Sequence, residues 1–378
     1  MKTSSFGRTY FELSRGGSDN LRSMEGLRGF AVFLVFLAHY ATFTWPYLPR
    51  ESLDREIVLY LRHLGNGGVD LFFVLSGYLI YGSFISRPQD LRVYARRRIV
   101  RIYPAYTAVL LVYVVLNLFH PDGGKLAGTP GETLVHIGLD FLLMAPLFQI
   151  PPLVAVSWSL TYEVCFYLAV PLAIEALRLR RWRSSARFLA MLAVTLVGAC
   201  LFHRAQGGPD RLLMFMAGIL AYEAHESRLL APPTQAVALV VLVLALIQKA
   251  DGRLQHMIDV VITIAAYFAL CLSCFGRPSG WLSRSYSWTP LRWFGNMSYS
   301  YYLAHGLGLQ VAFLLMEKSL GGALAAEPVW FGYLLLPAFV LSLLPALVLY
   351  LAVERPLSLA SGPRRLATAP MEPRTADP

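Results

Sequence analysis

The chain has 378 residues, of which 56% are hydrophobic and 15% charged, and its mean hydropathy is +0.52. These values exclude an ordinary soluble domain and indicate an integral membrane protein. The net charge of +10 does not indicate nucleic-acid binding, because the basic residues cluster beside apolar segments, where they act as topology signals. The four cysteines all lie in apolar segments, a pattern that favours neither a disulfide scaffold nor a metal site.

Residues 1–23 form a polar leader ahead of the first apolar segment. We expect this leader to be cytoplasmic rather than a signal peptide, because no small-residue cleavage site follows the apolar run. The rest of the chain, residues 24–356, is predicted to be an all-α transmembrane domain with about ten spans. These lie near residues 27–45, 69–85, 99–119, 157–177, 186–203, 211–224, 232–248, 257–275, 298–317 and 330–353.

Residues 133–150 are also apolar, but Asp140 and Pro146 interrupt them. If this segment crossed the bilayer, every later loop would change sides, and most lysines and arginines would lie outside. The positive-inside rule therefore favours a re-entrant or interfacial helix here, with both termini cytoplasmic. The tail, residues 357–378, is rich in Pro and Arg and is predicted to be disordered.

The first span contains two ionisable residues, Arg28 and His39. Their separation of eleven residues is within about 20° of three helical turns, so both are expected on one face, roughly 16 Å apart. Ionisable groups inside spans are costly and by default indicate function. The charge pattern places Arg28 at the cytoplasmic face and His39 past the midplane.

The second span is entered through GNGGVDLFFVLSGYLI, which contains Asp70 and Ser76. Asp70 could be the N-cap of the span, where its carboxylate would accept hydrogen bonds from the first backbone amides. Alternatively it could belong to the site. The glycines allow close backbone approach or a break in the helix.

The third span follows a basic cluster in which Arg98 and Arg101 lie one turn apart. Two guanidiniums on one face at the cytoplasmic surface suit a phosphate ligand, although attraction to lipid headgroups would explain them equally well. The fourth span, SWSLTYEVCFYL, contains Glu163, a carboxylate that should be neutral or paired with a cation. Trp158 in the same segment, Ser76, and His305 in the ninth span are secondary candidates for the site.

These residue types favour group transfer. An imidazole near the midplane can act as a general base that removes a proton from a hydroxyl. The cytoplasmic arginines could hold the anionic head of a donor whose thin arm reaches towards His39. The sequence contains neither a phosphate-binding P-loop nor a dinucleotide fingerprint, and its ionisable residues lack zinc-ligand spacing.

Six motifs spread over residues 25–356 resemble those of the integral-membrane acyltransferase-3 family, which includes O-antigen, peptidoglycan, Nod-factor and macrolide acyltransferases. They are EGLRGFAVFLVFLAHY, with an Arg-x10-His element, GVDLFFVLSGYLI, RRRIVRIYP, with an Arg-x-x-Arg element, WSLTYEVCFYL, GNMSYSYYLAHGL and the closing VERP.

The resemblance implies a ten-span bundle in the bacterial cytoplasmic (inner) membrane that transfers an acyl group, commonly acetyl, from acyl-CoA to a hydroxyl of a carbohydrate or glycolipid. His39 would be the base or the acyl carrier, and Arg28, Arg98 and Arg101 would hold CoA. Glu163 and Asp70 would orient these groups. Some family members carry an additional periplasmic domain; we expect none in this chain, so a periplasmic partner would act in trans.

A transporter of a glycan or acyl donor is the alternative function. In that case His39 and Glu163 would be relay residues along a transport path. It predicts movement of substrate without covalent change.

Overall fold

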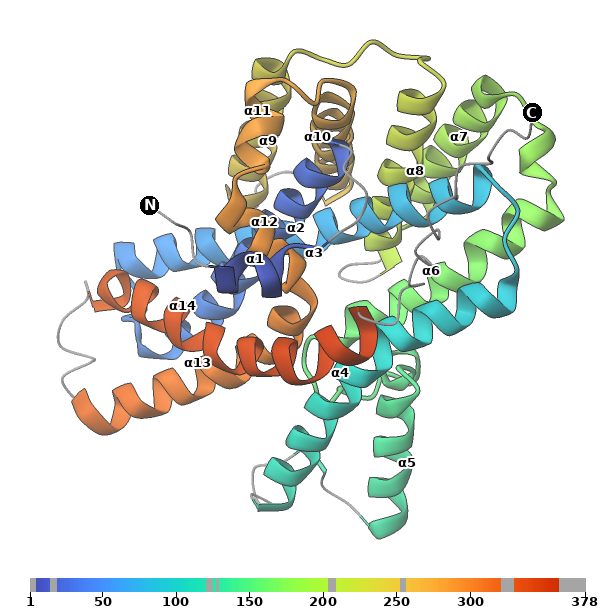
Figure 1. Ribbon diagram of the computed structural model, residues 1–378. Helices are drawn as coiled ribbons and strands as arrows, with labels where there is room; N and C mark the ends of the chain where they lie inside the picture. The colour runs from blue at the N-terminus through green and yellow to red at the C-terminus, as the bar shows by residue number, and fades with distance from the viewer. Residues whose placement is uncertain are drawn as a thin grey trace, which may run out of the picture.

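The computed structural model describes residues 5–13, 19–119, 125–126, 129–202, 209–251, 256–320 and 330–359. Within these ranges the chain is helical and has no β-strand (Figure 1). The longer helices are α1 (Ser5–Phe11), α2 (Asp19–Thr44), α3 (Leu53–Ile85), α4 (Leu91–Phe119), α5 (Pro130–Phe141), α6 (Ser157–Ala176), α7 (Ser184–Phe202), α8 (Leu212–Glu226), α9 (Gln235–Asp251), α10 (His256–Gly276), α11 (Trp281–Tyr286), α12 (Thr289–Asn296), α13 (Ser298–Leu320) and α14 (Trp330–Leu349). Short 3-10 segments are η1 (Trp45–Tyr47), η2 (Ala145–Phe148), η3 (Leu179–Arg181) and η4 (Pro209–Arg211), and η6 (Tyr350–Leu359) is π-helical.

Helices α2 and α3 form the centre of the bundle and pack against each other more extensively than any other pair. Their close approach depends on Gly68, because a Cβ atom at this position would lie 2.3 Å from the carbonyl oxygen of Ala31. Helices α12 and α13 pack on α2, and α8 packs on α3. Gly65 likewise faces the α2 backbone at Ala38, so both glycines serve the packing of α3 on α2.

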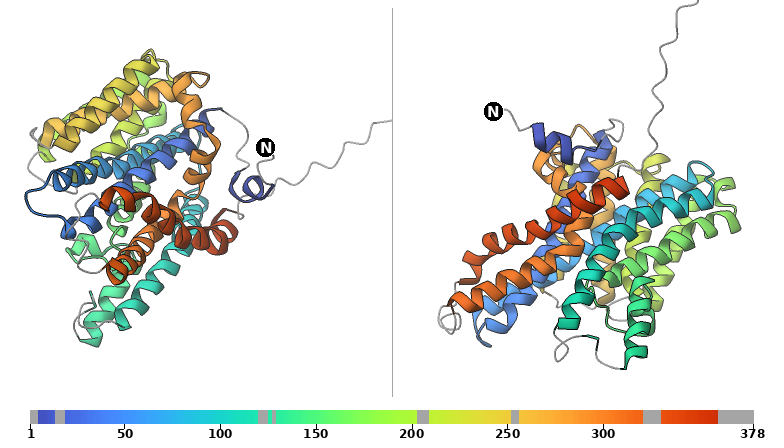
Figure 2. Two further views of the ribbon diagram at one scale, coloured as in Figure 1. Left: turned by 90° about the vertical axis from the view of Figure 1, so that its left-hand side faces the viewer. Right: turned by 60° about the horizontal axis from the view of Figure 1, so that its bottom comes forward.

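The other helices form pairs around this centre. The α9–α10 pair and the α13–α14 pair lie on different sides of it, and α4 and α5 project from one end of the bundle (Figures 1 and 2). The N-terminal half of α4 is held by η6 near the end of the described chain.

Seven helical segments are long and apolar enough to cross a membrane, which makes this a multi-pass membrane protein. They are Arg22–Tyr47, Leu53–Ile85, Leu91–Phe119, Ser157–Ala176, Ser184–Phe202, Ile258–Gly276 and Phe331–Leu359. The other three expected spans correspond to α8, α9 and α13, which do not meet both criteria over their described residues. The count of ten and the sides of the termini remain predictions.

The doubtful segment at 133–150 does not form one continuous helix. Helix α5 ends at Phe141, and a turn with Leu143 at a φ of 57° separates it from η2. Twelve residues of α5 rise about 18 Å, which is shorter than the hydrocarbon core. The buried carboxylate of Asp140, near the end of α5, accepts a hydrogen bond from the amide of Leu153 at 3.1 Å, which ties the segment after η2 back to α5.

The leader is anchored to the bundle, which the sequence did not indicate. Arg292 of α12 bonds Glu12 at 2.5 Å and Glu25 of α2 at 3.0 Å, and Trp293 also donates to Glu12. The ring of Phe11 stacks on Tyr350 of η6 at 5.4 Å. Helix α2 begins at Asp19, inside the expected leader of residues 1–23. Of the tail predicted to be disordered, only residues 357–359 are described; the remainder lies outside the described residues.

Candidate active site

Arg28 and His39 stand on one uninterrupted helix, because α2 continues through Thr44 without a proline or a break. Both side chains are half-buried. The continuous helix preserves the expected alignment, in which eleven residues separate the two groups by roughly 16 Å along the axis.

His305 of α13 lies directly against His39. The ring centroids are 4.8 Å apart, and the ring planes meet at 70°. His305 is completely buried, and its ring also stacks on Tyr301 at 5.4 Å. From the sequence, His305 was a weaker candidate than His39, because a lone histidine in a helix bundle is usually a packing residue. The structure brings both histidines into one site.

Tyr302, which sequence reasoning missed, connects this pair to the start of α6. Its hydroxyl lies 2.6 Å from the Ser159 hydroxyl and donates to the carbonyl of Val156 at 3.0 Å. Its ring centroid is 6.3 Å from that of His305. The available signal was its position one turn before His305, on the same helix face.

Glu163 of α6 contacts Ser76 of α3, and the two candidate residues come from separate sequence motifs. The Ser76 hydroxyl donates to the Glu163 carboxylate at 2.8 Å, and the Tyr167 hydroxyl donates to the same oxygen. Among the described residues, Glu163 thus makes no hydrogen bond to the cation that the sequence led us to expect. Arg98 instead lies over the ring of Tyr167, with its guanidinium carbon 5.4 Å from the ring centroid.

Arg98 and Arg101 have different surroundings, although they lie one turn apart. Arg101 forms an ion pair with Glu354 of η6 and lies over the ring of Tyr299. Arg98 is half-buried between the rings of Tyr94 and Tyr167, and its Nε makes no hydrogen bond within the described part of the chain. Of the two motif arginines, Arg98 is therefore the better placed to bind an anion.

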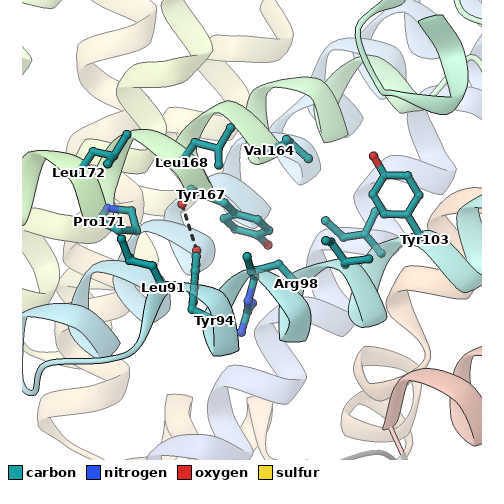
Figure 3. A pocket seen from close by; sticks show the side chains of 12 residues that line it. Leu91, Tyr94, Arg98, Tyr103, Val164, Tyr167, Leu168, Pro171 and Leu172 are labelled. Atoms are coloured by element: carbon teal, nitrogen blue, oxygen red, sulfur yellow. Dashed lines mark hydrogen bonds between the residues drawn. The ribbon is translucent and has the colours of Figure 1, made fainter. Parts of the chain in front are cut away.

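Arg98 also lines a pocket of about 310 Å³ between α4 and α6 (Figure 3). It is the only charged residue of the lining; the remaining lining residues are apolar or aromatic. Tyr94 and Tyr167 lie beside it, and the Tyr94 hydroxyl donates to the Tyr167 carbonyl at 3.3 Å. Leu168 and Leu172 line the pocket while more than half of each side chain is exposed, so the pocket opens on the outer surface of the bundle.

Asp70 is not a helix N-cap, so that interpretation was wrong. Helix α3 begins at Leu53, with Ser52 as its cap, and Asp70 lies buried in its interior. Its carboxylate forms ion pairs with Lys249 of α9 at 2.9 Å and with Arg211 of η4 at 3.6 Å.

Trp158 joins this group through Arg211. The guanidinium carbon of Arg211 lies 5.1 Å from the Trp158 ring centroid. Arg211 thus links the candidates Asp70 and Trp158, and Lys249 is a second cation on Asp70; neither cation was selected from the sequence. Lys249 was the visible signal, as a lysine at the end of an apolar helix.

The chain matches the sequence profile of the acyltransferase domain family, acyltransferase-3, over residues 21–353. It belongs to this family. The match includes His39, His305, Glu163, Asp70 and all three motif arginines, and it makes the protein an acyltransferase. The resemblance of the motifs is thereby confirmed.

Three curated relatives carry related names. The chain is 26% identical to acyltransferase MdmB of Streptomyces mycarofaciens, over 93% of this chain and 95% of the relative. It is 27% identical to the putative peptidoglycan O-acetyltransferase YrhL of Bacillus subtilis, and 24% identical to peptidoglycan O-acetyltransferase OatA of Listeria monocytogenes. Both alignments cover 75% of this chain, which spans only 47% and 48% of those two relatives. No solved structure matches the chain.

Within the acyltransferase-3 family, motifs that are distant in sequence meet in this fold. The Arg-x10-His motif touches YSYYLAHGL through the two histidines, and GVDLFFVLSGYLI touches WSLTYEVCFYL through Ser76 and Glu163. The Arg-x-x-Arg motif meets the closing VERP through Arg101 and Glu354. Each motif supplies a side chain that contacts another motif.

Proposed function

We propose that this protein is a membrane-embedded O-acyltransferase of the bacterial cytoplasmic membrane. It transfers an acyl group, most simply acetyl, from cytoplasmic acyl-CoA to a hydroxyl of a carbohydrate or glycolipid. His39 is the general base. Ten crossings with both termini cytoplasmic would give the orientation, with α8, α9 and α13 completing the seven longer apolar segments.

The observation that carries this proposal is the pair of histidines in the bundle interior. His39 lies on the same helix as the motif residue Arg28 and against His305. Imidazole is a suitable base for a hydroxyl because its neutral form has a lone pair at physiological pH. Apolar side chains would serve packing or lipid contact better, because they carry no ring nitrogens that need hydrogen-bond partners.

In the transfer step, His39 first accepts a proton and later donates it. The imidazole takes the proton of the acceptor hydroxyl as its oxygen attacks the thioester carbonyl carbon. A carbon–oxygen bond forms, the carbon–sulfur bond breaks, and the proton then passes from His39 to the CoA thiolate. If His39 carried the acyl group itself, its nitrogen would attack the thioester carbonyl, forming a nitrogen–carbon bond as the carbon–sulfur bond breaks and CoA leaves as the thiolate. The acceptor oxygen would then attack the same carbonyl, the nitrogen–carbon bond would break, and the hydroxyl proton would pass to the thiolate.

The donor would bind on the cytoplasmic side. Arg28 and Arg98 are the side chains we assign to its phosphates, because guanidiniums bind phosphate oxygens in pairs. Arg101 would act indirectly, by holding α4 to Glu354 and so fixing the position of Arg98. Arg98 lies in the N-terminal part of α4, beside the basic cluster that we expect at the cytoplasmic surface.

Peptidoglycan is the acceptor named for two of the relatives, and we propose a cell-envelope glycan as the acceptor here. Glu163, with its two hydroxyl partners, and Asp70, with its two cations, would hold the helices around the acceptor path. A periplasmic partner in trans would be needed if the glycan is modified far from the membrane.

Purified protein in proteoliposomes, supplied with [14C]acetyl-CoA outside and peptidoglycan fragments or lipopolysaccharide inside, tests the proposal. We expect label in one of the glycans together with release of CoA. The transporter alternative predicts movement of donor or glycan across the bilayer without label in a glycan or on the protein. That outcome would contradict an acyltransferase acting on these acceptors.

A further inference from the structure

The second ring nitrogen of His305, Nε2, is buried and makes no hydrogen bond to any residue that the structure describes. Buried polar atoms are nearly always paired, because burial without a hydrogen bond costs free energy. Nε2 of His305 therefore needs a hydrogen-bond donor, and the His39 imidazole is in contact with the His305 ring.

The proton of His305 can be placed from its other nitrogen. Nδ1 lies 2.9 Å from the carbonyl oxygens of both Tyr301 and Tyr302. A carbonyl oxygen only accepts hydrogen bonds, so Nδ1 must carry the hydrogen. In the neutral ring Nε2 then has a lone pair and can only accept.

The His305 ring is held in this orientation. Tyr301 stacks on it with an interplanar angle of 10°, and the Tyr301 hydroxyl is itself fixed 2.6 Å from the Ser342 hydroxyl of α14. The ring therefore cannot turn Nε2 away without breaking the contacts to the backbone of α13. The His39 side chain, by contrast, makes no hydrogen bond to any residue that the structure describes, and it is only half-buried.

We propose that His305 is a positioning residue for His39, an inference that rests on the proposed function. Its Nε2 accepts a hydrogen bond from one N–H of His39, through a small rotation of the His39 ring. This bond fixes the tautomer of His39, so the lone pair lies on its other nitrogen and faces the acceptor hydroxyl.

The pairing also acts during the transfer. When His39 takes the hydroxyl proton on its free nitrogen, the existing N–H bond to His305 stabilises the imidazolium that forms. His305 gains no proton itself, because the proton leaves His39 for the thiolate. The arrangement follows the general logic of a base that is oriented by a third group.

Two substitutions separate this role from packing. In His305→Asn the amide N–H₂ can still reach the Tyr301 carbonyl, but no acceptor remains near the position of Nε2. In His305→Gln the longer side chain can place its amide oxygen near that position. We expect His305→Asn to lower kcat about a hundredfold or more with little change in KM for acetyl-CoA, and His305→Gln to recover a large part of that loss.

The matched control is His225→Ala at the end of α8, which removes a histidine outside the proposed site and should leave kcat unchanged. All variants should be compared for thermal stability in detergent. Equal or better turnover for His305→Asn than for His305→Gln, with both folded, would overturn the positioning role. If His39→Ala retains full activity, the proposed function fails instead; loss of activity in His39→Ala with normal turnover in both His305 variants rejects only the present inference.

Discussion

Arg101 and Glu354 form an ion pair across 253 residues of sequence, and the pair joins the third motif of the chain to the last. Glu354 is completely buried and also accepts hydrogen bonds from the backbone amide of Ser300, at 3.1 Å, and from its hydroxyl. One carboxylate therefore fastens α4, α13 and η6 together. It fixes the helix that carries Arg98 relative to the helix that carries His305.

Loss of this carboxylate should destabilise the protein strongly. Glu354→Ala leaves Arg101 without its counter-charge and Ser300 without its acceptor, and breaking a buried pair typically costs about 3–5 kcal/mol. The double variant Arg101→Met/Glu354→Leu should recover much of the loss, because it leaves no unpaired charge. Thermal unfolding in detergent, followed by size-exclusion chromatography, measures both. A double variant no more stable than Glu354→Ala would contradict the role of the pair.

Substitution of Asp70 distinguishes its two interpretations. Asparagine is as good an N-cap as aspartate, so Asp70→Asn would be nearly neutral at a helix start. In the buried ion pair observed here, Asp70→Asn should cost about 3–5 kcal/mol, because Lys249 and Arg211 lose their shared negative charge. Thermal unfolding of Asp70→Asn, and of Asp70→Asn/Lys249→Met as a partial rescue, provides the measurement. A neutral Asp70→Asn would argue against the ion pair.

Docking of the leader should weaken in acid. Partial burial raises the pKa of Glu12, but the hydrogen bonds from Arg292 and Trp293 outweigh it, and the net pKa lies below the ordinary value of 4.5. A carboxylate with a lowered pKa stabilises the folded state above the ordinary pKa, and this contribution is lost as pH falls through the folded-state pKa.

Hydrogen exchange of residues 5–13, corrected for intrinsic rates, should therefore accelerate as the pH falls below about 4.5. Glu12→Gln should exchange faster at neutral pH and lose this pH dependence. A peptide from α13 serves as the control for global unfolding. Identical exchange of the leader in Glu12→Gln and the unsubstituted protein would show that the Arg292 contact does not hold it.

Hydropathy predicted the apolar helices well because each span must bury its own backbone hydrogen bonds, and that requirement is local in sequence. The start of α3 was predicted wrongly. Gly65, Gly67 and Gly68 suggested an interruption, yet the helix runs through all three. Gly65 and Gly68 face α2, and Gly67 faces Tyr267 of α10, so each glycine makes room for a neighbouring helix. Whether a glycine breaks a helix or allows a neighbouring helix to approach becomes clear only when that neighbour is known.

The site was predicted as a set of residues but not as an arrangement. His39, Glu163 and Arg98 could be chosen from the sequence, because ionisable groups in apolar segments are unusual. His305 and Ser76 were candidates too, but their contacts with His39 and Glu163 could not be predicted, because they depend on the packing of helices far apart in the chain. The pairing of Arg101 with Glu354 was hidden for the same reason. The same holds for Arg292, whose contacts with Glu12 and Glu25 depend on the position of α12.

The central claim is that His39 is the base of an acyl transfer, and single-turnover acetyl transfer by His39→Ala tests it most directly. His225→Ala, at the end of α8, is the matched histidine control. The account predicts that His39→Ala accumulates and inserts like the unsubstituted protein but transfers acetyl to glycan at least about a hundredfold more slowly, while His225→Ala transfers normally. Transfer by His39→Ala at the unsubstituted rate would contradict it.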